Sequence, residues 1–134
     1  GMTVLSLSGE LIRDNYLYKN VNQWFNAGVA FYPSCGKQKL LMPVIVFIGE
    51  LDEWLSPTNC KLWKQRDEEQ ISSGLLQIFI YKNAHHGFNK ELFKKLERST
   101  SKNHDYAGRA YQYNEFADKD SETKMLDFFE TRLN

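Results

Sequence analysis

An aspartate and a histidine each follow an apolar segment of the chain, and both are residue types that serve in acid–base catalysis. Asp52 ends the motif Gly-Glu-Leu-Asp directly after residues 43–48, and His86 lies in Ala-His-His-Gly-Phe shortly after residues 76–81. If both segments are parallel strands, their carboxyl ends meet at one edge of a sheet, where open α/β sheets assemble their sites. A carboxylate there can hold one imidazole nitrogen while the other acts as a general base. The pattern therefore predicts two members of a catalytic triad.

Three apolar segments have the length and composition of buried strands. Residues 43–48 are continuously apolar and β-branched, which is typical of a central parallel strand covered on both faces. Residues 28–32 and 76–81 are similar short runs bounded by turn residues. We expect an α/β fold, a three-layer α/β/α sandwich, with a parallel sheet in the order 28–32, 43–48 and 76–81.

Helices are predicted between and around these strands. One runs from Ser56, whose hydroxyl would be the N-cap before Pro57, to about Ser72. Because it joins two strands, the unit over residues 43–81 should be parallel and right-handed. Another helix opens the chain, from Met2 to about Tyr18. The last runs from about Ser121, and its predicted apolar stripe is Met125, Leu126, Phe129 and Leu133.

The length and composition of the chain argue for a single domain and against nucleic-acid and membrane partners. The length of 134 residues suits a single domain over 1–134. Seventeen basic and seventeen acidic residues cancel, which argues against a nucleic-acid partner. The longest apolar run, residues 40–48, is too short for a membrane helix, and no signal pattern is present, so we expect a cytoplasmic protein. Cys35 and Cys60 are expected to be two reduced, buried thiols, because a domain of this size does not need a disulfide.

Plainer roles exist for the same side chains. Asp52 could simply cap the turn before Ser56, and His85 and His86 could be a partly buried pair or belong to a metal site with His104. No carboxylate lies at helical spacing to complete such a set, so no metal or cofactor is predicted. Other residues of interest have packing or solvent contact as their expected role: Tyr32, Glu50, Trp54, and the charged run from Lys61 to Glu69.

The joint pattern resembles the dienelactone hydrolase family over nearly the whole chain from Ala30 onward. The resemblance rests on strand, Gly-x-x-Asp, helix, strand, Ala-x-His-x-Phe, loop and C-terminal helix, and on Phe-Tyr-Pro at residues 31–33. It implies the C-terminal portion of an α/β-hydrolase fold that acts on carboxylic ester or lactone bonds. Its triad acid would be Asp52 and its triad histidine His86.

The chain departs from the family at the nucleophile. The sequence contains no Gly-x-Ser-x-Gly or Gly-x-Cys-x-Gly motif, and Ser6 and Ser8 lie in Leu-Ser-Leu-Ser-Gly without the preceding glycine. We expect the chain alone to be inactive. The rival hypothesis is a non-catalytic remnant that folds by self-association. The DNA upstream of the Met2 codon discriminates the two, and it also decides whether Gly1 is native or remains from a cleaved tag.

The strand at residues 28–32 is relevant to the oligomeric state of the protein. In the family fold this strand has a neighbour that carries the nucleophile, and here it has none. An apolar edge without Lys or Glu invites pairing with another chain. We therefore expect a homodimer through this edge, and a small-molecule ester or lactone as substrate.

Overall fold

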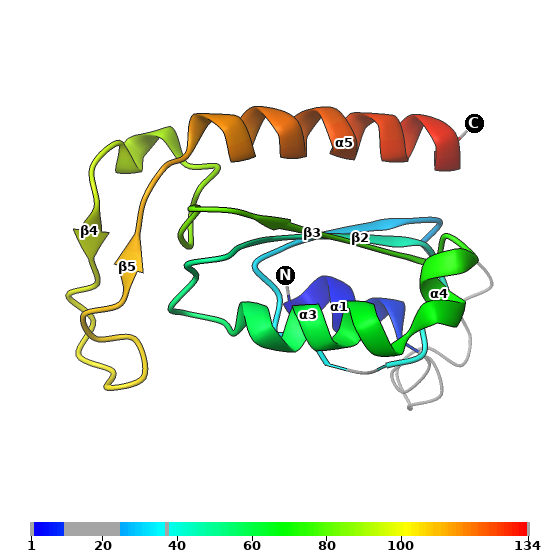
Figure 1. The fold of residues 1–134 in the computed structure, drawn as a ribbon, viewed down its shortest axis with the longest axis horizontal. Coiled ribbons are helices and arrows are strands. Elements are labelled where there is room, and N and C mark those ends of the chain that lie inside the picture. Colours follow the sequence, from blue (N-terminus) through cyan, green and yellow to red (C-terminus); the bar gives the residue numbers. More distant parts are fainter. Residues whose placement is uncertain (1, 10–24, 37, 134) are drawn as a thin grey trace.

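The computed structural model describes residues 2–9, 25–36 and 38–133 (Figure 1). Its main sheet has three parallel strands in the order β1 (Gly28–Phe31), β2 (Val44–Gly49) and β3 (Leu76–Tyr81). In the register of the sheet, Val44 lies opposite Gly28 on one side and Leu76 on the other. The predicted strand order and direction are confirmed.

The sheet is the middle of three layers (Figure 1). Helix α5 (Glu115–Leu133) lies along one face, and α1 (Met2–Ser8), α3 (Pro57–Arg66) and α4 (Glu68–Ser72) lie along the other. Every residue of β2 is buried, which agrees with its continuous apolar sequence. Alternate residues of β2 face two separate apolar cores, one around Val46 and one around Phe47.

The helical segment after β2 differs from the predicted single helix. It is divided at Asp67, whose backbone leaves the helical region with φ −116° and ψ 58°. Ser56 is the N-cap residue of α3, but its side chain makes no capping hydrogen bond. Instead, the carboxylate of Asp67 accepts a hydrogen bond from the backbone N–H of Gln70 and caps α4. Gly74, with φ +75°, ends the segment, close to the predicted end near Ser72.

The prediction of two reduced thiols is wrong, because Cys35 and Cys60 form a disulfide. Both cysteines are buried, as expected, at 6% and 0% exposure. Cys35 follows β1, and Cys60 lies on α3, in the same apolar core. Domain size carries no signal of this pairing, because the path of the chain brings together residues that are 25 positions apart.

Helix α5 begins six residues earlier than predicted and buries a different face. The side chain of Asn114 accepts a hydrogen bond from Ala117 N and caps its first turn. Its buried residues are Ala117, Ser121 and Phe128. Of the predicted stripe, Met125 and Phe129 pack on the core, but Leu126 and Leu133 are 53% and 58% exposed. Two of the three buried residues of α5 are thus small, and an apolar pattern does not detect them.

The remaining elements are short. The 3-10 helix η1 (Glu91–Phe93) precedes a hairpin of β4 (Glu97–Arg98) and β5 (Ala110–Tyr111). The predicted opening helix is confirmed over Met2–Ser8, and its continuation to Tyr18 lies outside the described residues. No helix in residues 2–9, 25–36 and 38–133 is long and apolar enough to cross a membrane.

Candidate active site

Asp52 is placed by a tight turn at the end of β2. The backbone N–H of Leu51 donates to the carbonyl oxygen of Ala84 at 2.9 Å, which joins this turn to the loop after β3. Gly49 begins the turn, and a Cβ atom there would overlap the carbonyl of Ala84. The glycine of the Gly-Glu-Leu-Asp motif is therefore required because the two loops approach each other closely.

His86 is placed by the loop after β3. Asn83 and Gly87 take positive φ values of 57° and 73° on either side of it, so the chain turns sharply before and after the histidine. The carbonyl of His86 then accepts a hydrogen bond from Gln112 N at 3.2 Å, which ties the loop to the end of the hairpin.

The two side chains meet as predicted. His86 Nδ1 lies 2.9 Å from Asp52 Oδ2, a hydrogen-bond distance. The Asp52 side chain is fully buried, and its other oxygen, Oδ1, accepts hydrogen bonds from Trp54 N at 2.7 Å and Leu55 N at 2.9 Å. Asp52 therefore caps the turn with one oxygen and contacts the imidazole with the other, so both roles considered for it occur together.

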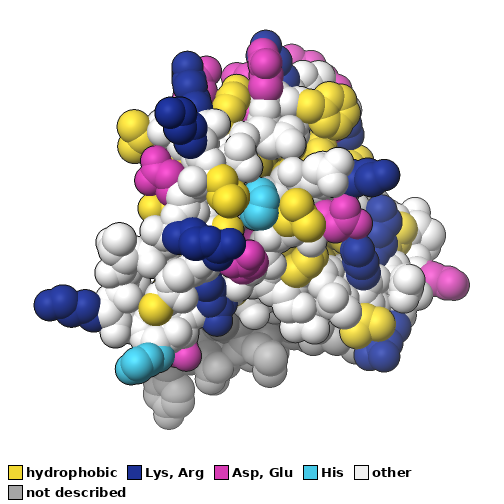
Figure 2. Space-filling view, turned by 60° about the vertical axis from the view of Figure 1, so that its left-hand side comes forward, with side chains coloured by type: hydrophobic (Ala, Val, Ile, Leu, Met, Phe, Trp, Pro, Cys, Tyr) yellow, Lys and Arg dark blue, Asp and Glu magenta, His cyan; other side chains and the backbone are white. Residues whose placement is uncertain are grey.

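The second nitrogen of the imidazole is open. The His86 side chain is 23% exposed, and no hydrogen bond to Nε2 is found in the described part of the chain. Figure 2 turns the hairpin end of the molecule forward, and a histidine lies at the centre of this face with hydrophobic and acidic side chains around it. With Nδ1 directed at a carboxylate, Nε2 is free to accept a proton from a group that approaches the surface.

Tyr32 and Trp54 both contact the His86 ring. The Tyr32 ring centroid lies 4.5 Å from that of His86, and the Trp54 ring is stacked on it at 5.1 Å. Tyr32 has a positive φ of 51°, which is strained for a tyrosine. Its hydroxyl donates to Asn89 Oδ1 and accepts from Asn89 N. Burial raises the pKa of Tyr32 above its ordinary value, so the hydroxyl stays protonated.

The hairpin adds contacts that the sequence did not predict. Trp54 Nε1 donates to the carbonyl of Ala110 at 3.1 Å, and the ring of Tyr106 is stacked on Trp54 at 5.2 Å. Arg109 Nη1 donates to the carbonyl of Trp54 at 2.7 Å, and Ala110 N donates to Glu53 Oε2 at 2.9 Å. The one hint in the sequence was Tyr106, the only aromatic residue of the polar segment 99–109.

Other candidate residues lie elsewhere. Glu50 pairs at the surface with Lys61 Nζ at 3.7 Å. His85 Nδ1 is buried without a hydrogen-bond partner, and His104 is exposed on the hairpin loop. The Ser8 hydroxyl donates to the carbonyl of Leu5, and Ser6 is exposed on the same helix. No group of three side chains able to hold a metal occurs in the part of the chain that the structure describes.

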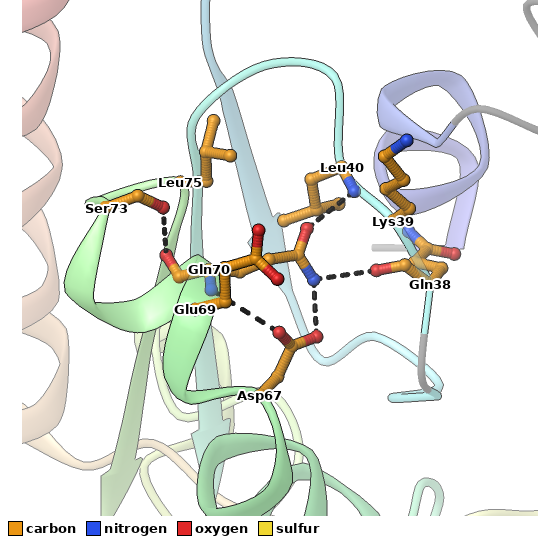
Figure 3. A pocket seen from close by; sticks show the side chains of 8 residues that line it. All are labelled: Gln38, Lys39, Leu40, Asp67, Glu69, Gln70, Ser73 and Leu75. Atoms are coloured by element: carbon orange, nitrogen blue, oxygen red, sulfur yellow. Dashed lines mark hydrogen bonds between the residues drawn. The ribbon is translucent and has the colours of Figure 1, made fainter.

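A separate pocket of about 510 Å³ lies between α4 and the segment at residues 38–40 (Figure 3). The side chain of Gln70 reaches across it, accepting a hydrogen bond from Leu40 N and donating to the carbonyl of Gln38 and to Asp67. The polar atoms of this side chain are thus used to hold the segment in place. Neither Asp52 nor His86 lines this pocket.

Comparisons with known proteins bear on the family and the fold. The sequence pattern of the Dienelactone hydrolase family matches residues 15–133. A crystal structure of a Klebsiella pneumoniae protein assigned as a dienelactone hydrolase superposes with a TM-score of 0.55 at 22% identity, over 85% of this chain and 45% of that one. This likeness shows a partial α/β-hydrolase fold.

A second solved structure is more distant. Thermogutta terrifontis esterase 2, phosphorylated by paraoxon, superposes with a TM-score of 0.49 at 14% identity, over 83% of this chain and 41% of that one. The chain thus spans less than half the length of either solved protein. No curated protein sequence matches it.

Proposed function

Because the chain belongs to the dienelactone hydrolase family, we propose that it supplies the acid and the base of a site that hydrolyses carboxylic ester or lactone bonds. His86 is the general base, and Asp52 orients it. The observation that carries this proposal is the 2.9 Å contact between His86 Nδ1 and a fully buried carboxylate, while Nε2 stays open to the surface.

The chemistry follows from the two nitrogens. Nε2 takes the proton of a hydroxyl or thiol nucleophile as that group attacks the substrate carbonyl. The resulting imidazolium is stabilised by the negative charge of Asp52, and it returns the proton to the departing alcohol. In the second half of the cycle Nε2 takes a proton from water as the water attacks the acyl group. The imidazolium then returns this proton to the oxygen or sulfur of the nucleophile as the acid departs.

We propose that the nucleophile comes from outside these 134 residues, because they contain no Gly-x-Ser-x-Gly or Gly-x-Cys-x-Gly motif. The oxyanion donors would come with it, since one of them is the backbone N–H after the nucleophile. In this proposal residues 1–134 form one domain, the C-terminal portion of the hydrolase. The chain alone should then hydrolyse esters only at the background rate.

The decisive experiment uses a polypeptide extended by the reading frame upstream of the Met2 codon. It should hydrolyse p-nitrophenyl acetate or a small lactone, and His86→Ala should lower kcat/KM by about 10³-fold or more. His104→Ala, in the exposed hairpin loop, is the control and should leave the rate unchanged. Full activity of the extended His86→Ala variant would disprove the role of His86.

The second candidate is a non-catalytic remnant that folds by self-association. The edge strand β1 favours it, because β1 pairs only with β2 within the described residues and carries the partly buried Val29 and Phe31. A stop codon or frameshift directly upstream of Met2 would support this candidate over the hydrolase.

A homodimer through residues 28–32 is part of the same proposal, and light scattering at several concentrations tests it. A monomer at high micromolar concentration would contradict the dimer.

The cytoplasmic location predicted from the sequence stays a prediction, and the Cys35–Cys60 disulfide opposes it. Disulfides persist in oxidising compartments and are rare in the cytosol. Alkylation of the denatured, unreduced protein from its native source, followed by mass spectrometry, distinguishes the two locations. Two alkylated cysteines would favour the cytoplasm, and none would favour an oxidising compartment.

A further inference from the structure

The Nδ1 contact alone does not fix the plane of the His86 ring. A single hydrogen bond holds one atom of the imidazole, and the ring can still turn about the Cα–Cβ and Cβ–Cγ bonds within the range that this hydrogen bond allows. A contact on the face of the ring removes this freedom and so determines the direction in which Nε2 points. For a base that must lie within hydrogen-bond reach of a nucleophile, that direction matters as much as the distance.

Trp54 makes such a contact. Its ring lies 5.1 Å from the His86 ring, and the two planes differ by only 21°. The Tyr32 ring also touches the imidazole, but at an interplanar angle of 42°, so it is a poorer guide for the ring plane. Trp54 belongs to neither apolar core of the molecule, so packing in a core does not account for it.

Trp54 is itself fixed by the hairpin. Its indole N–H donates to the carbonyl of Ala110, and its ring is stacked on that of Tyr106 at an interplanar angle of 23°. The guanidinium of Arg109 lies 5.7 Å from the Tyr106 ring centroid and also donates to the carbonyl of Trp54. The imidazole, the indole, the phenol and the guanidinium thus form one continuous stack from the buried acid to the hairpin loop.

We propose that Trp54 is a positioning residue for His86 and that the hairpin from Glu97 to Tyr111 sets its position. This inference rests on the proposed function, in which His86 is the general base. The hairpin then acts on the reaction through Trp54, without contributing a group to the chemistry.

The experiment measures the Nδ1 proton of His86 by NMR in the chain itself, so it needs no activity. In the wild type this proton should give a downfield signal that exchanges slowly with water, and Asp52→Asn should abolish it. Trp54→Ala should make its exchange roughly two- to tenfold faster, as expected from the worth of one aromatic contact. Trp54→Phe keeps a ring against His86 and should restore most of the protection.

Two further variants keep the test decisive. Tyr106→Ala removes the ring that stacks on Trp54 from an exposed hairpin. Exchange of the Nδ1 proton should become faster than in the wild type, by a smaller factor than in Trp54→Ala. This variant decides the outcome if Trp54→Ala does not fold. Phe116→Ala, an exposed aromatic on α5 that contacts Tyr81, is the control and should have no effect. If Trp54→Ala folds and its exchange is unchanged, the proposal is overturned while the dyad stays intact. If Trp54→Ala does not fold, unchanged exchange in Tyr106→Ala has the same meaning. A missing signal in the wild type would instead overturn the dyad and the proposed function with it.

Discussion

The turn after β2 and the β4–β5 hairpin support the same imidazole in different ways. In the turn, the Asp52 carboxylate is completely buried, and both of its oxygens have hydrogen-bond partners. In the hairpin, nearly all residues from 97 to 108 are exposed. It is joined to the site through Trp54 and Glu53 and, at its end, by the hydrogen bond from Gln112 N to the His86 carbonyl. Local unfolding begins where burial is low. The comparison therefore indicates a rigid acid beside a hairpin that can open on its own.

The largest effect should come from breaking the turn. Asp52→Ala leaves the N–H groups of Trp54 and Leu55 without their acceptor, and we expect the free energy of unfolding to fall by about 2–4 kcal/mol. Asp52→Asn retains one acceptor oxygen and should cost less. Urea denaturation followed by circular dichroism measures both. Equal losses for the two variants would show that the turn does not depend on the carboxamide or carboxylate oxygen.

Crowding the same turn should have the next largest effect. Gly49→Ala places a Cβ against the carbonyl of Ala84, and the backbone must shift to make room, at a cost of about 1–3 kcal/mol. Gly36→Ala is the matched control, because a Cβ at that position meets no atom within 4 Å. Thermal unfolding of the two variants compares them. A Gly49→Ala protein as stable as Gly36→Ala would mean that the two loops are not in close contact.

A change in the hairpin should cost less. Arg109→Ala removes the hydrogen bond to the Trp54 carbonyl, and we expect a loss of up to about 1 kcal/mol in global stability. Amide hydrogen exchange should rise in residues 97–111 while it stays unchanged in β2. Lys102→Ala, on the exposed loop, serves as the control. Faster exchange in β2 would show that the hairpin and the sheet unfold as one unit.

The smallest effect concerns the pH dependence where α5 meets the sheet. The pKa of Asp120 is lowered by the hydrogen bond that its carboxylate accepts from Lys124. A further hydrogen bond from the Tyr81 hydroxyl also lowers it. A lowered folded-state pKa contributes stability that is present above the unfolded value of about 3.9 and is lost as pH falls through the folded value. Asp120→Asn should therefore flatten the loss of stability below about pH 4. An unchanged acid limb in denaturation curves would contradict this.

The sheet and the dyad could be predicted because their signals are local. Val44 to Ile48 is continuously apolar, and the parallel strands deliver Asp52 and His86 to one edge. The disulfide and the hairpin contacts join residues 25 to 57 positions apart, and only the path of the folded chain brings them together. The start of α5 was missed because Ala117 and Ser121 are too small to form an apolar pattern.

The disulfide between Cys35 and Cys60 also reduces the number of conformations that the unfolded chain can adopt. The bond closes a loop of about 25 residues that contains all of β2 and Asp52. Closing a loop of this length removes roughly 3–4 kcal/mol of conformational entropy from the denatured ensemble. In a chain with a three-stranded sheet, this is a large share of a typical domain's stability of about 5–15 kcal/mol. The order around Asp52 therefore depends on chain entropy that is lost before folding begins, as well as on contacts in the folded state.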